Sequence, residues 1–214
     1  MDVIHWFVDV ILHLDQHLAA LLAQYHGWVY AILFAVIFAE TGLVVTPFLP
    51  GDSLLFGVGA LAAVTGSSSL SAPLAALLLT AAAVLGNTLN YHIGRWIGPA
   101  VFSGGNRFLK LDYLHRTQDF YARHGGKTVM LSRFLPILRT FAPFVAGVGA
   151  MHYGRFQLFN IAGATAWVVL LVGGGYLFGN VPIVRNHFGL VTIGIIAISL
   201  LPLLIAALKS RQPP

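Results

Sequence analysis

Apolar residues run in long blocks along this chain, and prolines, glycines and charges interrupt the blocks at a few places. A helix needs about 20 apolar residues to cross a hydrocarbon core of about 30 Å, because each residue adds about 1.5 Å. Blocks of roughly that length cover 73–97, 157–178 and 190–208. We predict a transmembrane helix at each, and one membrane domain over the whole of 1–214.

Residues 1–25 have a different pattern, in which apolar side chains recur at helical spacing and aspartates and histidines lie between them. This favours an amphipathic helix at the membrane surface, with a polar membrane span as the alternative. Acidic residues precede the apolar ones and no small-residue cleavage region follows, so we expect no removable signal peptide. The histidines lack ligand spacing, which indicates a polar face rather than a metal site.

The apolar stretch 28–64 is broken by residues that stop a helix, namely Pro47, Pro50 and Gly51. Asp52 can then cap a second helix of about 12 residues, which would rise about 18 Å and cannot cross a bilayer alone. The two pieces therefore predict a hairpin that enters and leaves the membrane at one face.

The stretch 128–151 is broken in a similar way, because Pro136 and Pro143 divide it into fragments of about eight residues. It is either one kinked span or a second hairpin. A basic segment, 102–127, precedes it and is predicted to be a cytoplasmic loop.

The positive-inside rule separates these alternatives. If 128–151 is a hairpin, Arg155, Lys209 and Arg211 share the cytoplasmic side with the basic loop and only Arg185 lies outside. If it spans, the first three move outside. The hairpin is favoured, and the same parity makes 28–64 a hairpin that opens to the opposite face.

The predicted fold is an all-α polytopic membrane protein. It is an inverted repeat of two re-entrant helical hairpins, each followed by a transmembrane helix, with an N-terminal amphipathic helix and a C-terminal transmembrane helix. Transporters of this design place broken helices and a binding site near the bilayer midplane. Irregular backbone is tolerated at that depth only when it is buried in protein or lines a wet cavity.

Composition agrees with a membrane location, since 57% of the residues are hydrophobic and 9% are charged and the mean hydropathy is +0.82. The absence of cysteine excludes disulfides, thiolate catalysis and cysteine metal sites. The basic loop suits an anionic lipid surface and lacks the aromatic residues that stack on nucleic acid.

Four charges fall in the predicted hairpins, and each costs about 2.5–3.5 kcal/mol at the bilayer centre. Glu40, the only glutamate, and Asp52 lie on the first hairpin, and Arg133 and Arg139 lie on the second. If the hairpin tips meet, two guanidiniums suited to phosphate oxygens face two carboxylates able to carry protons. This predicts a secondary transporter for an anionic head group.

Structural roles are the alternatives for each charge. In these alternatives Asp52 is a helix N-cap, Glu40 forms a structural salt bridge with an arginine, and the side chains of the arginines extend to the membrane interface. Asn87 and Tyr91 lie one helical turn apart and, with Thr140, are candidates for lining the cavity. An interhelical hydrogen bond is an equally good explanation for Asn87 and Tyr91. Glycine-rich runs such as GVGA, GGGY and AGATA predict helix packing rather than phosphate loops, and we predict no cofactor, metal or catalytic residue.

Glu40 and the segments PFLPGDSLLF, YHIGR and SRFLPILRTFAPFVAG make this chain similar to the DedA (VTT-domain) family of bacterial inner-membrane proteins, over nearly its whole length. The family's acidic residue and Pro-x-x-Pro-Gly-Asp signature match Glu40, Pro47, Pro50, Gly51 and Asp52. Its Arg-Phe-x-Pro-x-x-Arg-Thr signature matches Arg133, Phe134, Pro136, Arg139 and Thr140. Gly86-Asn87 departs from the Gly-Asp of many members, so ion coupling through that position is not implied.

The resemblance implies paired re-entrant hairpins and lipid translocation driven by a proton or sodium gradient, above all the return of undecaprenyl phosphate across the inner membrane. It places the functional acids and arginines at Glu40, Asp52, Arg133 and Arg139. The alternatives are a phospholipid scramblase without ion coupling, a channel or scaffold, and a lipid phosphatase, whose Ser-Arg-x5-His-x3-Asp motif would need histidine at Arg139 and aspartate at Pro143. Whether the protein forms a homodimer is left open.

Overall fold

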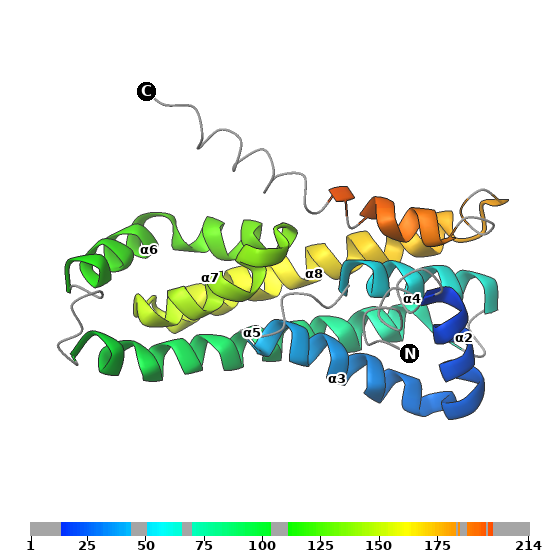
Figure 1. Ribbon diagram of the computed structural model, residues 1–214, viewed down its shortest axis with the longest axis horizontal. Coiled ribbons are helices and arrows are strands. Elements are labelled where there is room, and N and C mark those ends of the chain that lie inside the picture. Colours follow the sequence, from blue (N-terminus) through cyan, green and yellow to red (C-terminus); the bar gives the residue numbers. More distant parts are fainter. Residues whose placement is uncertain are drawn as a thin grey trace, which may run out of the picture. The chain divides into compact units, whose positions relative to one another are not determined.

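The computed structural model describes residues 14–43, 51–65, 70–103, 111–182, 184, 188–195 and 197–198. Every regular element in this part of the chain is helical, which confirms the all-α prediction there (Figure 1). The elements are α2 (Leu14–Tyr25), η1 (His26–Trp28), α3 (Val29–Gly42), α4 (Gly51–Thr65), α5 (Ala72–Ser103), α6 (Leu111–Leu131), η2 (Ser132–Phe134), α7 (Pro136–Val148) and α8 (Tyr153–Phe178).

Three described stretches are long and apolar enough to cross a membrane: Gln16–Gly42, Ala72–Gly98 and Tyr153–Phe178. The second and third match the predicted helices 73–97 and 157–178. The first joins residues that the sequence divided between a surface helix and a hairpin, although a 3-10 turn at His26–Trp28 interrupts it. Residues 1–13 and most of the predicted helix 190–208 lie outside the described residues.

The predicted basic loop 102–127 needs a correction, because most of it is helix. α5 continues to Ser103, and α6 occupies Leu111–Leu131. α6 is amphipathic: Tyr121 and Val129 are buried, whereas Arg123 and Lys127 are exposed. The charges lie on the outer face of a helix that packs against α7, and they do not mark an irregular segment.

Only one of the two prolines in 128–151 begins or ends a helix. α7 starts at Pro136, the position where a missing N–H costs nothing, but Pro143 lies inside it. A proline at 143 leaves a carbonyl of the preceding turn without its helical donor. In that turn the Asn90 side-chain amide donates to the Thr140 carbonyl at 2.7 Å. The N–H that Pro143 lacks would bond to the Arg139 carbonyl, so the Asn90 bond to Thr140 supports the same turn but does not replace the lost one.

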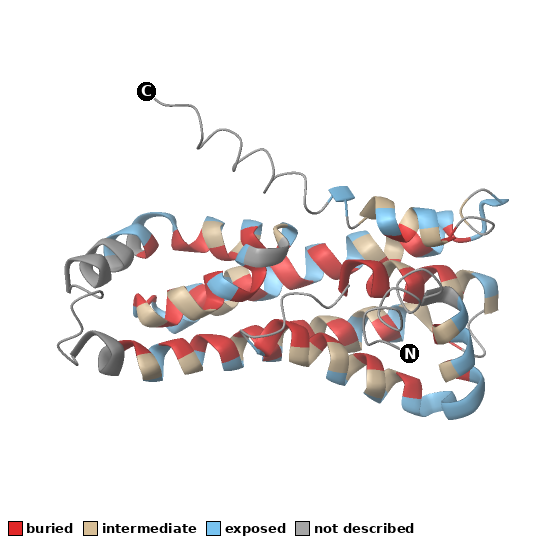
Figure 2. Cartoon of the chain, in the orientation of Figure 1, coloured by how far each residue is buried: buried red, intermediate tan, exposed pale blue. Residues whose placement is uncertain are grey.

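The first hairpin region contains α3 and α4, while Pro47 and Pro50 fall outside the described residues. α4 begins at Gly51, so Asp52 lies within the first turn and is not the residue before the helix. α4 is buried over most of its length (Figure 2).

Contacts divide the described chain into two compact units. Unit 1 takes its residues from 1–34, 50–79 and 168–214, and unit 2 takes them from 35–49 and 80–167. Three helices, α3, α5 and α8, contribute residues to both.

In unit 1, α4 packs directly on the C-terminal half of α8 through glycines. A Cβ on Gly59 would lie 2.0 Å from the Val172 carbonyl oxygen, and a Cβ on Gly175 would lie 2.0 Å from the Phe56 carbonyl oxygen. Since real Cβ atoms do not come so near, only glycine allows this contact between backbones. The prediction that the GVGA and GGGY runs serve helix packing is confirmed.

In unit 2, α7 packs on α5 with the same spacing. A Cβ on Gly147 would lie 2.0 Å from the Tyr91 carbonyl oxygen, and one on Gly94 would lie 2.1 Å from that of Phe144. In both units each helix offers a carbonyl and, three residues later, a glycine. The short helix α4 therefore contacts α8 through the same carbonyl–glycine spacing by which the short helix α7 contacts α5.

Candidate functional site

An acid and an arginine from the two predicted hairpins form a buried ion pair in unit 2. Glu40, in the last turn of α3, lies 3.1 Å from Arg139, in the first turn of α7, measured from Oε1 to Nη2. Their side chains are 1% and 3% exposed. The Arg139 guanidinium also lies 5.0 Å from the ring centroid of Trp167, a cation–π distance. The structure therefore brings these two charges together, in the salt bridge that was the alternative role for Glu40.

Arg133 is a second buried guanidinium, and it is 1% exposed. Its Nη2 donates to Asn160 Oδ1 at 2.5 Å and to the Ala83 carbonyl at 3.4 Å. Its Nε and Nη1 have no hydrogen-bond partner among the described residues. Gly163 leaves room for the side chain, since a Cβ there would lie 3.2 Å from Arg133 Cδ.

The two arginines give unit 2 an excess of buried positive charge. Glu40, Arg133 and Arg139 are the buried charged side chains of this unit, within the part of the chain that the structure describes. Among the described residues of unit 2, two buried cations thus stand against one buried carboxylate. Buried charge is costly at low dielectric, and an added anion would balance this excess.

Asn90 connects the two segments that carry the ion pair. From α5, its side-chain amide donates to the carbonyl of Thr140 at 2.7 Å and to that of Thr41 at 3.4 Å. These are the residues that follow Arg139 and Glu40. Thr140, a predicted cavity residue, is fully buried and meets α5 through its backbone. Asn90 therefore links the backbone segments that carry Glu40 and Arg139.

A network of side-chain amides surrounds the end of Arg133. Asn160 accepts from Arg133 and, at 3.2 Å, from Asn87, and it donates to Gln157 at 3.1 Å. Gln157 donates to the Tyr153 hydroxyl at 2.8 Å, and Tyr153 is 42% exposed. Asn87, a predicted cavity residue, thus forms the interhelical hydrogen bond that was its alternative.

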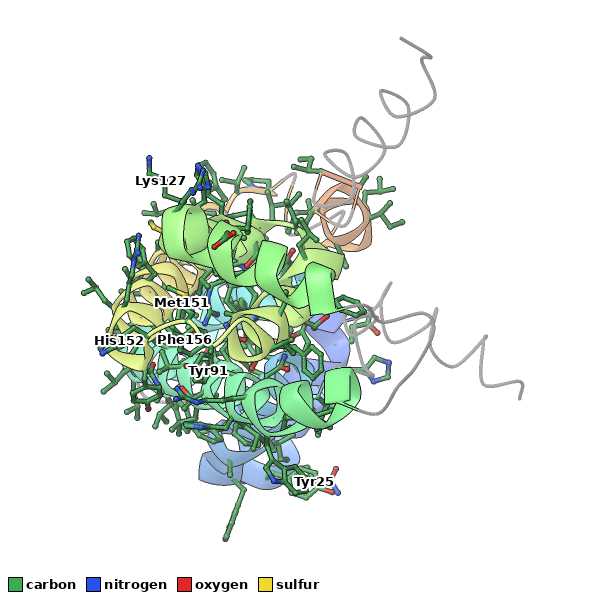
Figure 3. The ribbon with its side chains drawn as sticks, turned by 90° about the vertical axis from the view of Figure 1, so that its left-hand side faces the viewer. Tyr25, Tyr91, Lys127, Met151, His152 and Phe156 are labelled. Atoms are coloured by element: carbon green, nitrogen blue, oxygen red, sulfur yellow. The ribbon has the colours of Figure 1, made fainter. Side chains whose placement is uncertain are left out.

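Tyr91 lies in a hydrophobic cluster of unit 2. Its ring stacks on Phe156 with centroids 4.3 Å apart, and its hydroxyl donates to the Met151 carbonyl at 2.5 Å (Figure 3). The cluster also contains buried Tyr121, Val129 and Ala146. These contacts are those of a packing residue, and they differ from the predicted role in lining the cavity.

Asp52 belongs to unit 1, not to the unit that holds the ion pair. It is 9% exposed and lies in the first turn of α4, where the helix dipole favours a negative charge. Of the four predicted charges, the structure therefore gathers Glu40, Arg133 and Arg139 in unit 2 and leaves Asp52 in unit 1.

Sequence reasoning missed Asn90, Asn160 and Trp167. The signal was present for the two asparagines, because polar side chains within membrane-length helices are rare and usually face the protein interior. Nothing in the sequence marks Trp167 apart from its place in an apolar helix.

Comparisons with known proteins show the family of this chain. Residues 49–177 match the VTT domain. The chain is 49% identical over 213 residues to Protein DedA of Escherichia coli strain K12, covering 99% of this chain and 97% of that protein. It is 41% identical to Uncharacterized membrane protein Rv0364 of Mycobacterium tuberculosis, over 83% of this chain and 78% of the relative.

A further relative is Inner membrane protein YghB of Escherichia coli strain K12, at 39% identity over 84% of this chain and 82% of that protein. No solved structure matches the chain. The resemblance predicted from the sequence motifs is confirmed, and the chain belongs to the DedA family of VTT-domain membrane proteins.

Proposed function

We propose that this membrane protein is a transporter that moves a lipid phosphate, with undecaprenyl phosphate as the leading candidate, between the leaflets of the bacterial inner membrane. The observation that carries the proposal is the buried excess of positive charge in unit 2. Arg133 keeps two nitrogen atoms without a hydrogen-bond partner among the described residues, and a phosphate has oxygens to accept from them. The prenyl chain would remain in lipid while the phosphate crosses.

Glu40 gives this site a means of coupling to protons. In the structure its carboxylate occupies Arg139. Protonation of Glu40 would remove the negative charge and free Arg139 to join Arg133 on the phosphate; deprotonation would restore the ion pair and release the lipid. Asp52 is proposed as a second coupling acid that acts from unit 1. In a variant of this scheme, sodium ions take the place of protons at the carboxylates.

The hairpins are proposed to be re-entrant, with the segment around 102–127 and the C-terminus in the cytoplasm. Shared glycine registers of α4 on α8 and of α7 on α5 support two structurally related halves. Short helices of 15 and 13 residues at Gly51–Thr65 and Pro136–Val148 would not span a bilayer alone.

The test is leaflet exchange of undecaprenyl phosphate in liposomes that contain the purified full chain, with and without a proton gradient. We expect gradient-stimulated exchange that Glu40→Gln and Arg133→Met both abolish. Methionine fills similar space without charge, so Arg133→Met is expected to keep a normal melting temperature. Arg123→Gln, which removes an exposed arginine of α6, is the matched control and should exchange normally.

The outcomes separate the alternatives. Exchange that is independent of the gradient and survives Glu40→Gln would indicate a passive scramblase. Normal gradient-driven exchange by a well-folded Arg133→Met protein would refute the phosphate-binding role. Release of inorganic phosphate from the lipid would instead indicate a phosphatase.

A further inference from the structure

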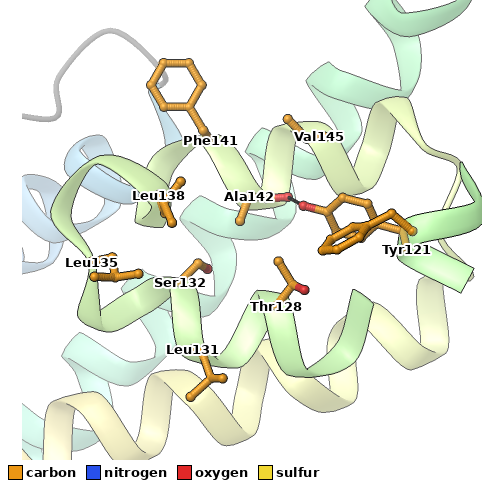
Figure 4. Close-up of a pocket in the computed structure, with 10 residues that line it drawn as sticks. Tyr121, Thr128, Leu131, Ser132, Leu135, Leu138, Phe141, Ala142 and Val145 are labelled. Carbon is orange, nitrogen blue, oxygen red and sulfur yellow. Dashed lines mark hydrogen bonds between the residues drawn. The ribbon is translucent and has the colours of Figure 1, made fainter. Parts of the chain in front are cut away.

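An apolar groove lies between α6 and α7 in unit 2, and its lining residues do not include Glu40, Arg133 or Arg139 (Figure 4). Its volume is about 470 Å³, within the range of ligand cavities. At one end the Tyr121 hydroxyl donates to the Ala142 carbonyl at 3.0 Å, which ties the two helices together. At the other end η2 joins them. Leu131, on one wall, is 61% exposed.

The walls of the groove offer hydrocarbon but few free polar groups. Three hydroxyls line it, and each donates within the protein: Tyr121 as above, Ser132 to the Val129 carbonyl at 3.0 Å, and Thr128 to the His124 carbonyl at 3.1 Å. Burial raises the pKa of Tyr121 to about 12, so its phenol stays a donor. The remaining lining residues are leucine, phenylalanine, alanine and valine. Such walls suit a hydrocarbon chain and offer little to a head group.

A basic edge runs along the same side of α6. Phe120, His124, Lys127 and Leu131 are spaced by four, three and four residues and therefore share one helical stripe. The stripe begins and ends with groove residues, and His124 and Lys127 between them are exposed. The His124 ring contacts that of Phe120 at 5.6 Å, and Lys127 extends from the outer side of α6 (Figure 3). Asp119 is eight residues before Lys127, about 80° around the helix, and so lies outside this stripe.

We propose that this groove binds an anionic membrane lipid, with one hydrocarbon chain between α6 and α7 and its phosphate at Lys127 and His124. The occupant follows from the pairing of an apolar groove with a cationic edge in a membrane protein, since a zwitterionic lipid would gain less from that edge. This site goes beyond the proposed translocation, because it shares no residue with the Glu40, Arg133 and Arg139 site. If an experiment refutes one of the two sites, the other site is not affected.

The test uses the full chain in phosphatidylcholine liposomes that contain a trace of phosphatidylglycerol with a photoreactive diazirine in its acyl chain. After irradiation, mass spectrometry maps the labelled residues. We expect a peak on groove residues of α6 and α7, and unlabelled phosphatidylglycerol should compete about fivefold better than phosphatidylcholine. Lys127→Gln should remove that preference, whereas Arg155→Gln, which removes an exposed arginine of α8, should retain it.

A second variant tests the groove itself. Thr128→Trp should fill it and reduce the labelling peak at least about fivefold, while Thr128→Ser should leave the peak unchanged. Labelling spread evenly over lipid-facing helices, a peak that survives Thr128→Trp in a normally melting protein, or equal competition by phosphatidylcholine would each overturn the proposal.

Discussion

The two contacts between a short helix and a long helix have the same packing but differ in the buried charges of their units. α4 on α8 in unit 1 and α7 on α5 in unit 2 use the same reciprocal arrangement of carbonyl and glycine. Next to the second contact lie the Glu40–Arg139 ion pair and Arg133. α4 carries one buried charge, Asp52, in its first turn.

This difference separates what builds the fold from what performs chemistry. Glycines let backbones approach in both units, so they account for packing and not for function. Among the described residues, buried charges occur together in unit 2, and their cost is not explained by packing that unit 1 achieves without such a group. The predictions below break either the shared packing or the unshared charges.

The largest effect is expected from breaking the ion pair on one side only. Arg139→Leu would leave the Glu40 carboxylate buried without its cation and cost about 3–5 kcal/mol of stability. Glu40→Gln combined with Arg139→Leu removes both charges and should recover most of that loss. Thermal melting of the purified protein in detergent measures both. A double variant as unstable as Arg139→Leu alone would show that the charge pairing is not the cause.

Next in size are the glycine contacts, which should respond equally in the two units. Gly175→Ala and Gly147→Ala each place a Cβ 2.0 Å from a carbonyl oxygen, so we expect a loss of about 1–3 kcal/mol for each. Gly173→Ala is the control in α8, because nothing lies within 4 Å of its Cβ; it should be neutral or slightly stabilising. Tolerance of one contact and not the other would contradict their equivalence.

The sequence predicted two of the three membrane-length stretches and the residues of the main charge pair. Length and hydropathy suffice for 73–97 and 157–178, because hydrocarbon thickness fixes them. Glu40 and Arg139 were recognisable because a charge in an apolar segment needs a partner. These two constraints depend on the segment itself and not on the helices that pack around it.

The sequence misled where tertiary contacts decide the local structure. Pro143 was taken as a break, yet Asn90 from another helix supports that turn. The charges of Arg123 and Lys127 suggested a loop, but they form the outer face of α6. Neither of these follows from spacing along the chain.

A smaller change should sharpen the role of unpaired charge in unit 2. Asn160→Asp would place a carboxylate on the oxygen that now lies 2.5 Å from Arg133 Nη2. A charged acceptor should strengthen the bond to Arg133 and occupy the arginine, but the second carboxylate oxygen would meet the Val84 and Gln157 oxygens to which Asn160 now donates. We therefore expect loss of lipid exchange with little change in the melting temperature.

The control for that change is Gln157→Glu, which adds the same charge one turn away, where the side chain contacts Thr88 and Tyr153. It should leave exchange largely intact. If the Asn160→Asp protein folded normally and kept full exchange, the Arg133 nitrogens without a hydrogen-bond partner among the described residues would not be the phosphate site.

The smallest effect on stability is expected in unit 1. Asp52→Asn removes the charge from the first turn of α4 and keeps a polar side chain, so it should cost about 0.3–1 kcal/mol through the helix dipole alone. If Asp52 is also a coupling acid, gradient-driven exchange should fall far more than this small destabilisation explains. Leu54→Ala is a useful comparison in the same turn, since it should lower the melting temperature without altering the response to the gradient. A variant Asp52→Asn with normal coupling would restrict the acid to its structural role and leave Glu40 as the coupling residue.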